Sequence, residues 1–227
     1  HVGTPEERPF DIDIRANFIK VLKAAKAVPH DLLVISGDLC LEEGDLAIYQ
    51  WIKQQLDDFQ FNYLVIPGNH DNKEMMVKIF DLHELLQTGA LFLPSPSDQP
   101  PLVLLDSAPG QVDETALHLL REYLQSHSGP ICLFMHHPPC ATGLGYMDRL
   151  NCRNADALAA VIERHKQVIA ITCGHRHRAV HTNWAGVTAT VAPACSHSVA
   201  LDLVPEGVPG FVLEPPACQL FYLTQEG

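Results

Sequence analysis

Short apolar runs alternate with segments of helical periodicity along the first three quarters of the chain. Five continuous apolar runs are typical of strands that are buried on both faces: they span 31–36, 61–66, 101–107, 131–135 and 168–173. Apolar residues recur at helical spacing in the segments between them, which are 13–28, 45–57, 73–86, 113–125 and 155–165. The alternation predicts βα units and an α/β fold.

The last fifty residues have a different pattern, without helical spacing. The segments HTNWAGVTATVAP, HSVALDLVP, GFVLEPP and CQLFYL predict short strands joined by turns. The proline-rich stretch PSPSDQPP, residues 94–101, predicts a surface loop between two strands. Since no linker or charge block divides the sequence, we expect residues 1–227 to form a single domain.

The composition of the chain excludes some classes of binding partner. The formal net charge of −12 argues against a nucleic-acid polymer or an anionic membrane, because both require a basic surface. No apolar stretch has membrane-spanning length. Seven scattered cysteines without a CxxC pair are typical of reduced thiols in a cytoplasmic protein. A phosphate ligand would need a local source of positive charge.

Polar side chains follow four of the predicted strands directly. These clusters are Gly37-Asp38, Gly68-Asn69-His70-Asp71, His136-His137-Pro138-Pro139 and Gly174-His175-Arg176-His177. Ligands of open α/β sheets bind at the carboxyl ends of strands, so we expect the four clusters to converge. Each cluster alone is also compatible with a turn or a structural histidine. Their combination, each behind an apolar strand, favours a functional site.

The residue types point to metal binding. Carboxylate, amide oxygen and imidazole without thiolate suit Mn, Fe, Zn or Co. One ion cannot use so many donors, whereas two ions that share a carboxylate can, and such pairs clamp a phosphoryl centre. The sequence therefore predicts two divalent or trivalent transition-metal ions acting on a small phosphate ester.

The ordered set GD, GNHD, HHPP and GHRH resembles the calcineurin-like metallophosphoesterases. The likeness runs across nearly the whole chain, and the most similar subgroup is the bacterial class III cyclic-nucleotide and glycerophosphodiester phosphodiesterases. The resemblance implies a four-layer α/β/β/α sandwich of two mixed sheets flanked by helices.

Residue roles follow from the resemblance position by position. Asp38 resembles the carboxylate that bridges both metals, and His177 resembles a ligand of one of them. The remaining ligands of the other metal are matched by Asn69, His136 and His175. The resemblance implies catalytic roles for two residues. His70 would face the leaving group, and Asp71 would orient His70. His197, Asn69 and His70 are implied to bind substrate.

His1 resembles the histidine of the family's first motif, Asp-x-His. The motif's aspartate and the first strand would then precede His1. A smaller departure is Asn72, where the subgroup often has an aspartate.

Other polar residues are assigned lesser roles. We expect His137 to be structural or to support the ligand beside it, and Arg176 to point away from the metals. His181 and Cys195 are candidates for the pocket wall, and Asp148, Arg149 and Asn154 for substrate contact. The remaining histidines are expected on the surface: His30, His83, His118, His127 and His165.

The leading hypothesis is a phosphodiesterase that hydrolyses small diesters, with 3′,5′-cyclic nucleotides as candidates, through a metal-bridging hydroxide. The alternatives are a phosphomonoesterase or nucleotide pyrophosphatase on the same metals, and a non-catalytic metal-binding scaffold. A homodimer with a flat interface is also compatible with the sequence.

Overall fold

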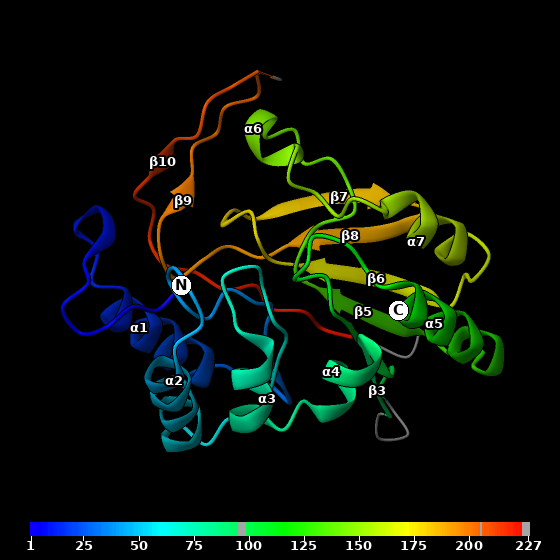
Figure 1. The fold of residues 1–227 in the computed structure, drawn as a ribbon, viewed down its shortest axis with the longest axis horizontal. Helices are drawn as coiled ribbons and strands as arrows, with labels where there is room; N and C mark the ends of the chain where they lie inside the picture. Colours follow the sequence, from blue (N-terminus) through cyan, green and yellow to red (C-terminus); the bar gives the residue numbers. More distant parts are fainter. Residues whose placement is uncertain (95–98, 205, 224–227) are drawn as a thin grey trace.

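A mixed six-stranded sheet forms the centre of the protein, for which a computed structural model describes residues 1–94, 99–204 and 206–223 (Figure 1). The strand order is β3-β4-β5-β6-β8-β7. Across the sheet the strands are β3 (Ala90–Leu93), β4 (Leu102–Leu105), β5 (Ile131–Met135), β6 (Val168–Cys173), β8 (Val187–Val191) and β7 (Val180–Trp184). The four inner strands are parallel, and the two edge strands run antiparallel to them.

Two smaller sheets accompany the central one. Strands β1 (Leu33–Ile35) and β2 (Tyr63–Val65) form a parallel pair, and β9 (Ser198–Val199) pairs antiparallel with β10 (Phe211–Val212). The helices are η1 (Pro9–Asp11), α1 (Ile14–Lys26), α2 (Leu46–Asp58), α3 (Lys73–Phe80), α4 (His83–Thr88), α5 (Glu114–Ser126), α6 (Gly145–Asp148) and α7 (Ala155–Ile162). The α/β class is confirmed.

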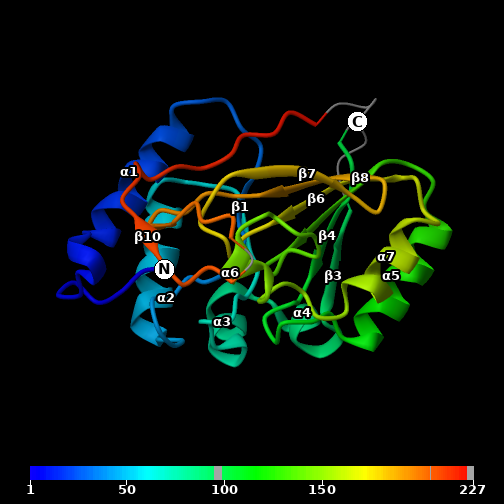
Figure 2. The ribbon, with the colours of Figure 1, turned by 90° about the horizontal axis from the view of Figure 1, so that it is seen from above.

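The alternation of side chains along the central strands creates the layers. In β5, Leu133 and Met135 face a core shared with α5 and α7, whereas Cys132 and Phe134 face a second core. That second core also contains residues of β1, β2, α1, α2 and α3. Figure 2 shows α5 and α7 on one side of the sheet and the β1/β2 half on the other.

Four helices begin at an Asp or Asn whose side chain accepts a hydrogen bond from a backbone amide of the first turn. The caps are Asp13, Asp45, Asn72 and Asp113. Asn72 follows the GNHD turn directly and caps α3 through the Met75 amide. The residue that departs from the subgroup's pattern therefore has a local role, which is to start the helix behind the turn.

Some elements differ from the sequence-based predictions. The single helix expected over 73–86 is wrong, because Asp81 adopts a left-handed conformation (φ 56°) that ends α3 before α4 begins. Strand β3 is the strand that the predicted loop over 94–101 implies on its N-terminal side. The tail contains less strand than expected, since β9 and β10 have two residues each and 213–223 has no regular structure. Of the loop predicted over 94–101, residues 95–98 lie outside the described part.

The fold brings the ends of β1, β2, β5 and β6 to one region, and two side chains tie neighbouring strand ends together. Lys73 at the start of α3 forms an ion pair of 2.6 Å with the buried Asp106 after β4. Ser107 Oγ accepts hydrogen bonds from the amides of His136 and His137 after β5. The ion pair connects the β1/β2 half to the central sheet, and the Ser107 bonds join two neighbouring strand ends within that sheet.

Candidate metal centre

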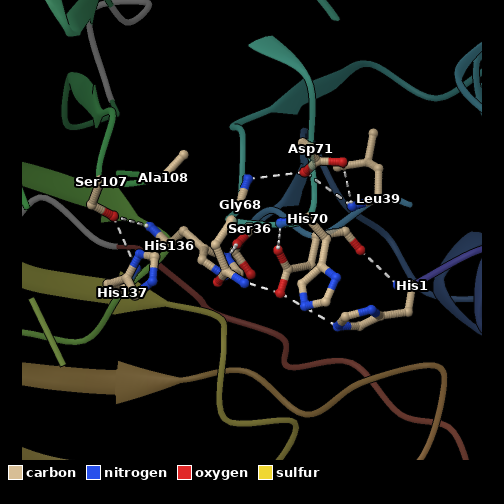
Figure 3. Close-up of polar contacts among 12 residues, drawn as sticks. His1, Ser36, Leu39, Gly68, His70, Asp71, Ser107, Ala108, His136 and His137 are labelled. Atoms are coloured by element: carbon tan, nitrogen blue, oxygen red, sulfur yellow. Dashed lines mark hydrogen bonds and ion pairs between the residues drawn. The ribbon is translucent and has the colours of Figure 1, made fainter. Parts of the chain in front are cut away.

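The carboxylate of Asp38 lies at the centre of the polar clusters and is 5% exposed. Its Oδ2 is 3.3 Å from His1 Nε2 and 3.1 Å from His136 Nε2. Its Oδ1 accepts a hydrogen bond of 3.0 Å from the His70 amide. One carboxylate oxygen thus stands between two imidazoles that come from opposite halves of the fold. Figure 3 labels both of these residues, His1 and His136.

Backbone carbonyls fix the orientation of the surrounding imidazoles. In three of them, Nδ1 lies within hydrogen-bonding distance of a main-chain oxygen: His1 with Leu41 (3.1 Å), His136 with Ser36 (2.7 Å) and His177 with His197 (3.1 Å). If Nδ1 carries the proton, Nε2 keeps its lone pair, which is the usual arrangement of a metal-ligating histidine.

The donors form two adjacent groups. His1, Asp38 and His177 have potential ligand atoms within 4.8 Å of one another, and so do His136, His137 and His175. Asn69, although exposed, places its Oδ1 3.2 Å from His136 Nε2 and so joins the second group.

The donor chemistry fits a pair of cations. The buried Nε2 of His175 and Nδ1 of His137 have no hydrogen-bond partner among the described residues. Buried polar atoms are normally paired, and a bound cation would satisfy such lone pairs. Oxygen and imidazole donors without thiolate suit transition metals of intermediate softness.

Burial and neighbouring charge set the protonation of the cluster. Burial alone raises the pKa of the Asp38 carboxyl, but His136 and His1 lower it more, so the net pKa lies well below its usual range. Burial lowers the pKa of His175 to about 2 and that of His177 well below its usual value. For His1, burial lowers the pKa, but contact with Asp38 outweighs it and the net pKa is raised. An ionised carboxylate beside the neutral imidazoles of His175 and His177 is the state that metal binding requires, and a metal ion at His1 would displace the proton that Asp38 favours there.

Backbone conformation marks the same positions. Asp38, His175 and His177 have left-handed φ angles of 54°, 68° and 53°. Such conformations are costly outside glycine and concentrate at ligand sites. Gly68 lies so close that a Cβ there would be 2.2 Å from Asp38 Oδ1. This close approach explains why glycine begins the GNHD turn.

His70 lies beside the cluster, but Asp71 does not orient it through a hydrogen bond. The ring of His70 is 4.7 Å from that of His1, centroid to centroid, and its Nδ1 is 3.0 Å from the carbonyl oxygen of Glu42. The Asp71 carboxylate accepts instead from the amides of Leu39, Cys40 and Gly68 and from the hydroxyl of Tyr49. The expectation that Asp71 fixes the His70 imidazole is therefore corrected: Asp71 holds the two ligand-bearing loops together.

Sequence reasoning missed several supporting groups. The sequence pattern identified Tyr49 only as part of the apolar face of its helix. In the structure its hydroxyl donates a hydrogen bond to Asp71 and accepts one from the amide of Asn72. The carbonyls of Ser36, Leu41 and Glu42 leave no signal in a sequence, because every residue has one.

The remaining predicted residues divide into near and remote groups. His197 lies 4.7 Å from His177 between ring centroids, next to the cluster. His137, expected to be structural or to support the ligand beside it, falls within the second donor group. Arg176 is fully buried and directed toward Asp148 and Asn151, in agreement with its predicted orientation away from the metals.

The three weaker candidates for substrate contact, all in the 148–154 stretch, make contacts within the protein. Asp148 accepts hydrogen bonds from Thr142 and Gly143, and Asn154 bonds to the backbone of Val112. Arg149 donates to the carbonyl of Gly207. These contacts hold loops in place.

A cavity of about 1000 Å³ extends from the cluster into the molecule. Its polar end includes His1, Asp38 and His136. Of the two candidates for the pocket wall, Cys195 lines the cavity, whereas His181 is exposed and outside it. The apolar remainder lies along β1 and beneath residues 217–223.

Known proteins are similar to this chain in sequence and in fold. Residues 11–179 match the family model of the calcineurin-like phosphoesterases. A relative from Fibrobacter succinogenes, named a probable cyclic nucleotide phosphodiesterase, is 33% identical over 86% of this chain and 76% of its own. A probable glycerophosphodiester phosphodiesterase from Arcobacter nitrofigilis is 32% identical over 86% and 74%. A dimetal phosphatase from Danio rerio has the same fold, with a TM-score of 0.63 at 15% identity over 78% of each chain.

Replacement of the central carboxylate tests the assembly of the cluster. We expect Asp38→Asn to reduce bound Mn²⁺ from about two ions per chain to about one or fewer, because a shared anionic ligand is lost. Metal analysis after gel filtration measures this, with the exposed Asp58→Asn as the charge-matched control. Full metal occupancy in Asp38→Asn would show that the carboxylate is not shared.

Proposed function

The chain belongs to the calcineurin-like phosphoesterase family, and we propose that it hydrolyses small phosphodiesters, including 3′,5′-cyclic nucleotides, at a dinuclear metal centre. The observation that carries this proposal is the position of Asp38 Oδ2 between His1 Nε2 and His136 Nε2. Members of the family use divalent metal ions. We propose that Mn, Fe, Zn or Co occupies both positions here.

The ligand sets follow from the two donor groups. We assign His1, Asp38 and His177 to one ion. Asn69, His136 and His175 would hold the second ion together with Asp38, which both share. When bound, the pair supplies positive charge at the phosphate and lowers the pKa of water toward neutrality.

Side chains in and beside the ligand sets bind and orient the substrate. His70 is held by the Glu42 carbonyl at Nδ1 and by the bond from its own amide to Asp38. Its Nε2 is therefore the atom that protonates or stabilises the leaving oxygen. Asn69 is exposed beside His136, and His197 lies beside His177, so both are assigned to the phosphate ester.

Two rival functions remain for the same site. The names of the relatives support a diesterase, since they refer to cyclic nucleotides and glycerophosphodiesters. A phosphomonoesterase or nucleotide pyrophosphatase would use the same ligands with different pocket walls. A non-catalytic scaffold is disfavoured by His70, which a metal-binding module does not need.

A substrate panel distinguishes these possibilities. We expect the Mn²⁺-loaded protein to hydrolyse 3′,5′-cAMP and bis-(p-nitrophenyl) phosphate, with p-nitrophenyl phosphate and a nucleoside diphosphate derivative turned over at least about 10-fold more slowly. Phosphate and nucleotide release measure the rates. Preferential hydrolysis of the monoester or the diphosphate would contradict the diesterase, and inactivity on all four would favour the scaffold.

The role of His70 has its own test. We expect His70→Ala to lower kcat on 3′,5′-cAMP by about 100-fold, in the range of general acid catalysis, while two metal ions stay bound. The exposed His83→Ala serves as the matched control. Loss of metal in His70→Ala would reassign His70 as a ligand.

We also propose that the protein is located in the cytoplasm and forms a homodimer. In the part of the chain that the structure describes, no helix has the length and apolar character needed to cross a membrane. All seven cysteines are free thiols, five of them buried, which supports a reducing compartment such as the cytoplasm. Exposed apolar side chains of the tail, among them Leu203, Val208 and Leu213, support a homodimer.

A further inference from the structure

Two phenylalanines from distant parts of the chain form an aromatic pair beside the candidate metal centre. The ring centroids of Phe10 and Phe211 are 3.8 Å apart, and that of Phe10 is 4.7 Å from His197. We propose that this pair binds the base, or another planar aromatic group, of the substrate. The inference rests on the proposed diesterase function and narrows its substrate class to diesters that carry an aromatic group.

The pair is connected to the metal cluster through a short series of rings. His1 lies 4.5 Å from His177, and His177 lies 4.7 Å from His197, between ring centroids. His197 is in turn 4.7 Å from Phe10. A phosphodiester held at the cluster would therefore extend one of its ester groups over His197 toward the phenylalanines.

Both rings remain accessible. Phe10 is 43% exposed and Phe211 is 45% exposed, and η1, which contains Phe10, has no buried residue. Apolar rings gain stability when they leave water, so two partly exposed rings next to a ligand site offer a surface that a planar group can cover.

The backbone holds Phe10 in a costly conformation. Its φ and ψ angles are 53° and 28°, and Asp11 also has a positive φ of 62°. For a bulky side chain this left-handed region is an outlier, and such outliers cluster at ligand clamps. Phe10 shares this left-handed conformation with Asp38, His175 and His177, and also with turn residues such as Gln60 and Asp81.

Phe211 is fixed from the other side. It pairs in the two-stranded sheet with Val199, a residue that lies two positions after His197 in the sequence. Arg178, next to His177, donates to the Val199 carbonyl and forms an ion pair of 2.8 Å with Glu214. The contact of the two rings places β10 beside the loop that carries Phe10. The hairpin and the loop that carries Phe10 therefore meet at a defined point.

Charge favours a neutral group on this surface. Residues 198–223 contain no Lys, Arg or His, and their charged residues are Asp202, Glu206 and Glu214. A second phosphate or a carboxylate would find no cationic partner in this segment, whereas a nucleobase requires none.

The alternative role for the pair is a latch that only joins the hairpin to the N-terminal loop. A latch would affect all substrates equally, but a binding surface would affect only those with an aromatic group. The glycerol headgroup of a glycerophosphodiester lacks such a group, and this difference separates the two roles.

The experiment compares Phe10→Ala and Phe211→Ala with ring-retaining Phe10→Tyr and Phe211→Tyr, using Leu213→Ala as the control for an exposed apolar neighbour. We expect each Ala variant to lower kcat/KM for 3′,5′-cAMP by about 10-fold, in the range of one base–aromatic stack. On glycerophosphoethanolamine all variants should stay within about twofold of the parent. The Tyr variants should retain most of the activity on cAMP.

Binding gives a readout that does not depend on turnover. In titration calorimetry the parent should bind AMP more tightly than glycerol 3-phosphate, and each Ala variant should lose that difference. Equal losses on both substrates, or no loss on either, would overturn the proposal. If the parent hydrolyses no diester but the Ala variants still lose AMP preference, the function fails while the aromatic surface stands.

Discussion

The arrangement of the site depends on a carboxylate that the fold has taken out of water. An ionised, buried Asp38 is costly unless cationic or hydrogen-bonding partners surround it. Its partners come from three separate parts of the chain: His1, the His70 amide and His136. Folding must therefore bring both halves of the sandwich together before this charge is compensated. Two cations at the same place would compensate it further and would also satisfy the buried imidazole nitrogens.

The two carboxylates of the motifs GD and GNHD have separate roles. Asp38 faces the imidazoles, whereas Asp71 faces backbone amides of the loops after β1 and β2. Asp71 stabilises the position of Asp38 without contacting the cluster. Tyr49 reinforces this from α2, because its hydroxyl bonds to Asp71 and to the amide that begins α3. The geometry around Asp38 thus rests on a frame of ordinary backbone hydrogen bonds.

The sequence revealed the groups whose chemistry is unusual and missed those whose chemistry is common. Polar residues behind apolar strands are rare, so Asp38, His136 and His175 could be identified, and the order of the motifs indicated the family. Carbonyl oxygens that orient imidazoles could not be identified, since they depend on tertiary position alone. Periodicity also failed at Asp81, where one left-handed residue splits a continuous apolar pattern into α3 and α4. Nothing local indicated that Phe10 and Phe211 would meet, because 200 intervening residues place them together.

A crystal of the Mn²⁺-loaded protein, measured with anomalous scattering at the manganese edge, tests the account most directly. We predict two peaks separated by roughly 3.5–4 Å, with Asp38 Oδ2 in contact with both and with His136 and His177 on different ions. A single peak, or two peaks of which only one contacts Asp38, would contradict the shared carboxylate on which the proposed function rests.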